Sequence, residues 1–226
     1  MKTKLVSLVR RWNGYNRMRT ASELRERIIR YAGPRFFEQG FSRITTEELA
    51  RQLGISKKTL YREFSSKEEI VRTVVRRSLA RVDAELNNIF DDETRSFLER
   101  FGAQLEAARR ILGFISKPFM YDLSRYLPAL WDEIQEFRRK RVFDRLENII
   151  RGGQKEGMIM KEIHPELLVM IITTVADNLL VPDVFAEQQM RPQEVIRHVG
   201  ILFSRGILTD YGRERLNTSG IIEGEY

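Results

Sequence analysis

The chain of 226 residues contains no cysteine and only two histidines, His164 and His198. Without cysteine it forms no disulfide framework, carries no thiol nucleophile and offers zinc no thiolate ligand. Neither histidine has carboxylates spaced around it as a metal site or a catalytic triad requires. We therefore expect no enzymatic activity, no metal and no cofactor. The absence of cysteine also fits a reducing cytoplasm.

Long apolar runs are also missing. The longest, residues 167–181, is interrupted by two threonines, Asp177 and Asn178, and falls short of the roughly 20 apolar residues that a membrane span needs. The apolar stretch at residues 4–9 is too short and too polar for the core of a signal peptide. These features lead us to expect a soluble cytoplasmic protein with no membrane contact.

Positive charge is concentrated in one third of the chain. Residues 1–67 hold sixteen Lys and Arg against six Asp and Glu, a net charge of +10, while the whole chain carries +7. Residues 68–226 therefore have a net charge of −3, the difference between +7 and +10. A basic segment followed by a mildly acidic one is typical of a nucleic-acid-binding domain joined to a second domain.

Residues 45–67, TTEELARQLGISKKTLYREFSSK, read as two short helices joined by a tight turn. Apolar positions mark the inner face of the first helix, and Gly54 follows where a helix end favours positive φ. Ser56 is a good N-cap for the second helix. Leu60 and Phe64 face inward, which leaves two lysines, a threonine and a tyrosine outside. This pattern predicts a helix-turn-helix whose second helix enters the major groove of DNA.

Glycine and proline divide the rest of the chain into further helices, and no segment alternates with a period of two. The sequence therefore predicts an all-α fold, with a three-helix DNA-binding domain followed by a helical body for ligand binding and dimerisation. The expected helices span residues 21–38, 66–90, 91–112, 128–153, 165–180 and 192–205. The expected domains are a basic extension (1–20), the DNA-binding domain (21–67), the body (68–210) and a polar tail (211–226).

The segment from about residue 23 to residue 72 resembles the N-terminal domain of the tetracycline-repressor (TetR) family of bacterial transcriptional regulators. The matching pattern is Ile28-Ile29, Phe36-Phe37, Gly40-Phe41, Thr45-Thr46, Ile55-Ser56-Lys57, Thr59-Leu60-Tyr61, Phe64 and Ser66-Lys67-Glu68-Glu69. The resemblance covers about a quarter of the chain, and the remainder is similar only in its all-α architecture. It implies a body that binds a small molecule and forms a homodimer.

The resemblance also implies roles for individual side chains. The phosphate-contacting positions of the family fall on Thr46, Thr59, Tyr61 and Lys67. Its base-reading positions fall on Lys57 and Lys58, with Arg43 and Ser56 close by. We also expect Thr46 and Ser56 to cap their own helices.

Two residues depart from the family pattern. Lys58 stands where many members have a small residue or proline, and its charge should raise the salt sensitivity of DNA binding. Glu63 stands where an aromatic residue or histidine often lies near a phosphate. Because a carboxylate there is repelled by DNA, we expect Glu63 to turn toward Arg62 or Arg51.

The basic extension, residues 1–20, holds six Lys and Arg and no acidic residue, interleaved with Trp12 and Tyr15. Three interpretations compete: a mobile tail, a DNA-contacting arm and a membrane-surface helix, for which the segment is short.

In the body, two sets of residues are candidates for function. Aromatic and apolar residues of the middle helices, together with one carboxylate, are candidates for the wall of an effector pocket, although core packing explains most of them. This set is Phe101, Leu105, Phe119, Met120, Tyr126, Trp131, Ile134 and Asp177. Apolar stripes on the helices at 165–180 and 192–205 are candidates for a dimer interface. This set is Leu168, Ile171, Ile172, Val175, Val195, Val199, Leu202 and Phe203.

The sequence thus predicts a homodimeric regulator, a repressor that binds a palindromic operator in double-stranded DNA and is released by a small apolar effector. Two-fold symmetry is expected because one motif makes too few base contacts for a specific site. The alternative is a DNA-bound structural or interaction protein on the same scaffold that responds to no effector.

Overall fold

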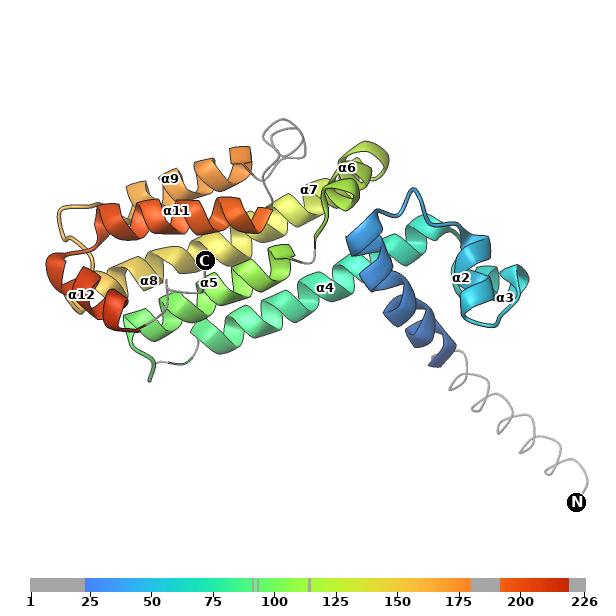
Figure 1. Ribbon diagram of the computed structural model, residues 1–226, viewed down its shortest axis with the longest axis horizontal. Helices are drawn as coiled ribbons and strands as arrows, with labels where there is room; N and C mark the ends of the chain where they lie inside the picture. Colours follow the sequence, from blue (N-terminus) through green and yellow to red (C-terminus); the bar gives the residue numbers. More distant parts are fainter. Residues whose placement is uncertain (1–22, 91, 93, 114, 180–191, 220–226) are drawn as a thin grey trace, which may run out of the picture. The chain divides into compact units, whose positions relative to one another are not determined.

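The computed structural model describes residues 23–90, 92, 94–113, 115–179 and 192–219. Helices are the only extended regular elements in these ranges, so the predicted all-α fold is confirmed (Figure 1). The chain divides into two compact units, Met1–Arg77 and Ser78–Tyr226. The helix α4 (Lys67–Phe90) contributes its first turns to one unit and its remainder to the other.

The first unit contains a helix at residues 23–39, then α2 (Thr46–Gln52), α3 (Lys57–Glu63) and the beginning of α4. The helix at 23–39 buries one apolar stripe, with Ile28, Ala32 and Phe36 fully shielded from solvent. Gly40 ends this helix with a φ of 81°. The α4 helix begins as predicted, because Ser66 Oγ accepts a hydrogen bond from the amide of Glu69 (3.2 Å).

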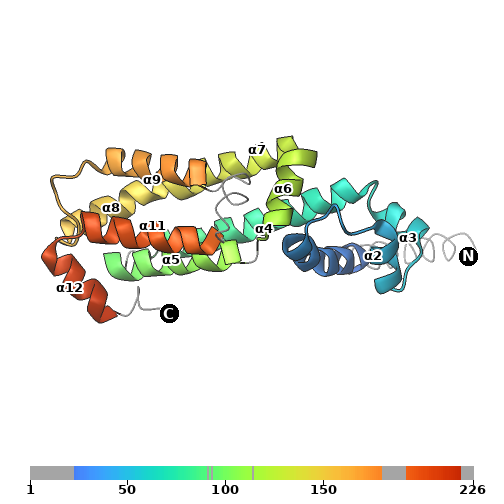
Figure 2. The ribbon, with the colours of Figure 1, turned by 45° about the horizontal axis from the view of Figure 1, so that its top comes forward.

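In its described residues, the second unit consists of the rest of α4 and eight further helical segments. These are α5 (Phe97–Gly113), α6 (Lys117–Tyr126), α7 (Pro128–Phe137), a π-helix (Arg138–Phe143), α8 (Asp144–Lys155), α9 (Pro165–Leu179), α11 (Pro192–Ile207) and α12 (Asp210–Ser219). The helix α5 packs against α8 and α11, and α8 packs against α9 (Figures 1 and 2). The helices predicted to open at Pro165 and Pro192 do so. No helix in the described ranges has the length and apolar character of a membrane span.

The start of α5 differs from the prediction, which placed it at Asp91. Asp92 instead accepts from the amide of Thr94 (3.1 Å) in a local turn, and the helix begins at Phe97. Ser96 and Glu99 cap it reciprocally: the Ser96 amide donates to the Glu99 carboxylate (2.8 Å), and the Glu99 amide donates to Ser96 Oγ (3.4 Å). This capping box, rather than the acidic run, sets the helix start.

The long helix predicted from Pro128 to Gly152-Gly153 also differs in detail. It is continuous as α7, the π-helix and α8, and it runs past both glycines to Lys155. Gly153 is required by a close approach: a Cβ there would lie 2.8 Å from both Ile159 Cδ1 and Phe97 Cδ2. The glycine pair therefore marks tight packing inside the helix and not its end.

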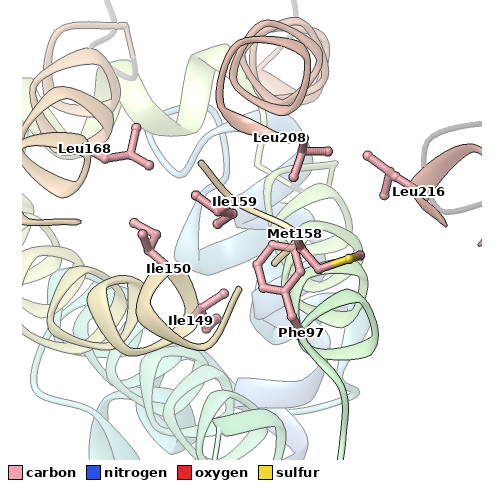
Figure 3. Close-up of a cluster of buried hydrophobic side chains, with 8 residues drawn as sticks. All are labelled: Phe97, Ile149, Ile150, Met158, Ile159, Leu168, Leu208 and Leu216. Atoms are coloured by element: carbon pink, nitrogen blue, oxygen red, sulfur yellow. The ribbon is translucent and has the colours of Figure 1, made fainter. Parts of the chain in front are cut away.

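The C-terminal segment was predicted to be a polar tail from residue 211. The described part of it forms α12, and Leu216 on this helix is only 3% exposed. Leu216 belongs to a cluster of buried side chains that holds α5, α8, α9 and the two C-terminal helices together (Figure 3). The cluster consists of Phe97, Ile149, Ile150, Met158, Ile159, Leu168, Leu208 and Leu216.

The two neighbouring glycines of α8 provide a matched stability test. We expect Gly153→Ala to lower the free energy of unfolding by about 1–3 kcal/mol, because the new methyl group overpacks the contact with Phe97 and Ile159. Gly152→Ala should be neutral or stabilising by up to about 1 kcal/mol, because the atom nearest its Cβ, an Arg100 guanidinium nitrogen 3.5 Å away, is at ordinary van der Waals distance. Urea unfolding of both variants measures the difference, and equal effects would contradict the packing.

Candidate DNA interface

The first helix of the motif, α2, is capped by Thr45 and not by Thr46 as the sequence predicted. Thr45 has an extended backbone (φ −90°, ψ 154°), and its Oγ1 accepts from the amide of Glu48 (3.1 Å). Thr46 is the first helical residue and is buried, with 7% exposure. Its Oγ1 lies 3.2 Å from the hydroxyl of Tyr61 on α3 and donates to Glu47 Oε2 (3.2 Å). Thr46 therefore joins the two helices of the motif.

The turn between α2 and α3 forms as the sequence predicts. Gly54 has a φ of 67°, a conformation that L side chains rarely adopt. The amide of Ile55 then donates to the carbonyl of Ala50 (3.0 Å), which closes the end of α2. Ser56 caps α3 by accepting from the amide of Thr59 (3.0 Å), and the two hydroxyls also pair (2.8 Å). The direction of α3 is thus fixed at its first residue.

The helix α3 buries one face and exposes the other. Leu60 is fully buried, and Phe64, directly after the helix, is 1% exposed. Lys57, Lys58 and Tyr61 are exposed, Tyr61 to 42%. The exposed face thus carries two ammonium groups and a phenol, which donate hydrogen bonds to phosphate oxygens and to guanine in the major groove.

Among these side chains Lys57 already has a partner within the motif. Its ammonium donates to Glu47 Oε1, on the second residue of α2, and lies 5.9 Å from the centroid of the Tyr61 ring. This hydrogen bond lowers the pKa of Glu47 below its ordinary value, and the same contact raises the pKa of Lys57. Both groups are therefore charged at neutral pH.

The other residues predicted to contact DNA differ in their exposure and in their hydrogen bonds. Arg43 is exposed in the loop before α2, and Thr59 is half-buried beside Ser56. Lys67 is half-buried, and its ammonium donates to the carbonyls of Phe41 (2.9 Å) and Ile44 (3.1 Å). Lys67 therefore stabilises the loop before α2, a role that the sequence did not indicate.

Glu63 faces away from the exposed face of α3, as predicted. Its side chain is only 8% exposed, and its Oε1 lies 3.4 Å from Arg62 Nε. The carboxylate of Glu63 therefore does not lie among the exposed lysines of α3.

Sequence reasoning missed the side chains that hold the end of α3 against the helix at 23–39. The Arg25 guanidinium lies 3.9 Å from the centroid of the Phe64 ring and donates to Glu69 (2.7 Å). Glu69 also accepts from the amide (2.6 Å) and the hydroxyl (2.8 Å) of Ser65. The hydrogen bond from Arg25 lowers the pKa of Glu69, which stays ionised. The only sequence signal is the spacing of Ser65 and Glu69, one helical turn apart.

The predicted effector residues are spread between the core and the surface. Phe119 and Met120 are buried, whereas Tyr126 is 56% exposed. Phe101 stacks on Phe97 (centroids 5.5 Å apart) at the edge of the core cluster, and Trp131 and Ile134 are half-buried. The side chains of Leu105 and Asp177 lie outside the described residues.

A surface depression beside α7 involves none of this set. It is lined by Ala129, Asp132, Glu133, Glu136 and Lys140.

The residues predicted to form the dimer interface are likewise divided between the core and the surface. Leu168 is 3% exposed and packs in the core of its own chain, so its assignment to the interface is corrected. Ile171 and Leu202 are 41% and 72% exposed, and two unpredicted apolar side chains of α9, Leu167 and Met170, are also exposed. Spacings of three and four residues place Leu167, Met170 and Ile171 on one face. Ile172, Val175 and Val199 are half-buried.

The side chains of Val195 and Phe203 lie outside the described residues, as does the basic extension at residues 1–20. In the described ranges no group of three or more His, Cys, Asp or Glu side chains comes together as a metal site requires.

Comparisons with known proteins support the identification of a helix-turn-helix in this chain. Residues 29–74 match the family model described as bacterial regulatory proteins, tetR family. An uncharacterised HTH-type transcriptional regulator of Bacillus subtilis, YvaF, is 24% identical over 173 residues, 76% of this chain and 90% of that protein. The nucleoid occlusion factor SlmA of Vibrio campbellii is 33% identical over 125 residues, 54% of this chain and 61% of that protein.

Among solved structures, a transcriptional regulator from Saccharomonospora viridis in complex with choline has a similar fold. Its TM-score is 0.65 at 19% identity, and the match covers 83% of this chain and 99% of that one.

Proposed function

Since this chain is a member of the tetR family of bacterial transcriptional regulators, we propose that it is a repressor that binds a palindromic operator as a homodimer and is released by a small molecule. The observation that carries the proposal is the exposed face of α3, with Lys57, Lys58 and Tyr61 presented by a helix whose other face is buried. Insertion of this helix into the major groove brings side chains of this kind to base edges and phosphates.

Within this proposal each side chain has a stated role. Tyr61, which is 42% exposed, donates to the phosphate backbone. Thr46 is only 7% exposed, and its hydroxyl, 3.2 Å from that of Tyr61, positions the phenol. Lys57 and Lys58 reach the bases or the adjacent phosphates. Ser56 and Thr59 fix the start of α3 through their hydrogen bonds. Arg43, exposed in the loop before α2, makes a further contact to DNA outside the two motif helices.

A salt titration tests the role of Lys58. We expect Lys58→Ala to reduce the slope of log K against log salt by up to about one if the ammonium meets a phosphate. A lost base preference with an unchanged slope would assign Lys58 to base reading instead. Lys155→Ala, an exposed lysine of α8, is the matched control and should leave both quantities unchanged. If Lys58→Ala behaves like this control, α3 does not dock as proposed.

A dimer is supported by apolar surface on the second unit. Leu167, Met170 and Ile171 on α9 and Leu202 on α11 are each more than 40% exposed in the single chain. Apolar side chains grouped on one helix face indicate a contact surface. A two-fold symmetric contact would use the same patch on both subunits and would match the symmetry of a palindromic operator.

Charge substitutions in this patch test the dimer. We expect the double variant Ile171→Glu, Leu202→Glu to be a folded monomer that no longer binds a palindromic site, because both side chains are exposed in the protomer and would be desolvated in the dimer. Tyr211→Glu, which changes a 52% exposed residue of α12, is the control and should remain dimeric. Sedimentation velocity at micromolar concentration makes the measurement. A monomeric wild type would contradict the two-half-site mechanism.

The effector of this proposal is a small, largely apolar molecule that carries a hydrogen-bond donor. Phe101 and Gln104 lie one turn apart on α5, and Trp131 and Gln135 lie one turn apart on α7. The side-chain oxygens of Gln104 and Gln135 are buried, and within the described part of the chain no group donates to them. A ligand that donates a hydrogen bond to either oxygen would remove the cost of burying an unpaired acceptor. The Saccharomonospora viridis regulator likewise holds a small molecule, choline.

A compound screen tests the effector. We expect active compounds to raise the melting temperature, to change the fluorescence of Trp131 and to release DNA. Gln104→Leu should weaken binding of such a compound while leaving DNA affinity unchanged, because it removes one acceptor from the body only. If no compound in a broad apolar library does this, the effector-independent alternative is favoured. The similarity of 125 residues to a nucleoid occlusion factor supports that alternative.

A further inference from the structure

Glu47 is an acidic residue within the surface that the proposed function assigns to DNA. It is the second residue of α2, its side chain is 61% exposed, and its Oε1 accepts from the ammonium of Lys57. Its other oxygen, Oε2, lies 3.2 Å from Thr46 Oγ1, which in turn lies 3.2 Å from the Tyr61 hydroxyl. Glu47 thus contacts Lys57, which the proposed function places at DNA, and Thr46, which positions Tyr61.

This position places a carboxylate where an anionic backbone must approach. A carboxylate repels phosphates, and while it is paired with Lys57 it also cancels one of the positive charges on α3. Both partners are at least half exposed, so the pair contributes little to folding and exchanges readily for another partner. The lowered pKa of Glu47 and the raised pKa of Lys57 keep both groups ionised across the neutral range.

We propose that Glu47 is a specificity-determining residue that restrains Lys57 until a correct base is present. The proposal rests on the proposed function, because it takes α3 to be the reading helix. On the operator, Lys57 leaves Glu47 for the O6 and N7 acceptors of a guanine, which replace the carboxylate. On other sequences Lys57 stays paired, and Glu47 repels the phosphates. Discrimination therefore comes from weakening the wrong complexes as well as from stabilising the right one.

The test compares wild type with Glu47→Gln on two duplexes of equal length. One carries the operator, found by selection from genomic fragments, and the other is an unrelated sequence. Glutamine keeps the side-chain shape and an acceptor for Thr46 but removes the charge. We expect binding to the unrelated duplex to tighten by about twofold to fivefold, the weight of one exposed charge contact, with a smaller change on the operator. The salt slope on the unrelated duplex should steepen by up to about 0.9, since Lys57 then meets a phosphate.

Two further variants show that the effect passes through Lys57. Glu48→Gln makes the same charge change one residue along α2, where the structure gives Lys57 no contact, and it should leave the ratio of the two affinities unchanged. In a Lys57→Ala background, Glu47→Gln should shift both duplexes equally, because the side chain that discriminates is gone. Thermal unfolding of each variant checks that the fold is retained.

The outcomes separate this inference from the proposed function. A wild type that binds no duplex, or binds all duplexes equally, overturns the proposed function itself. A wild type that discriminates, together with a Glu47→Gln variant that discriminates equally well, overturns only the role of Glu47. The same holds if Glu48→Gln lowers the affinity ratio as much as Glu47→Gln does.

Discussion

The burial of one face of α3 is the constraint on which the functional surface depends. Full burial of Leu60, worth about 2 kcal/mol, together with the Phe64 ring under the Arg25 guanidinium, fixes the rotation of this helix about its own axis. Because that rotation is fixed, Lys57 and Tyr61 face outward as a consequence of packing. The cap at Ser56 and the turn at Gly54 fix the direction in which the helix leaves α2.

The sequence predicted most of the first unit because its signals are local. The caps at Ser56 and Ser66 and the turn at Gly54 each depend on residues no more than a few positions away. The prediction of the α2 cap was wrong because two neighbouring residues compete for that position. Thr45 and Thr46 are adjacent and chemically equivalent caps, and only the backbone conformation selects Thr45.

The second unit was harder to predict because its outcome depends on tertiary contacts. Gly153 lies inside a helix because Phe97 and Ile159 occupy the space of a side chain, and no local pattern reveals that neighbour. Leu168 and Ile171 fit the same apolar stripe of α9, yet one is in the core and the other is exposed. Periodicity identifies an apolar face but not which part of it is covered by the chain itself.

The central claim is that two copies of α3 read a two-fold symmetric DNA site. Selection of genomic fragments by the purified protein, followed by sequencing of the bound DNA, tests it most directly. The expected result is an enriched palindrome whose half-sites lie about one helical turn, or a multiple of it, apart. Enrichment of a single asymmetric site, or no enrichment over input, would contradict the claim.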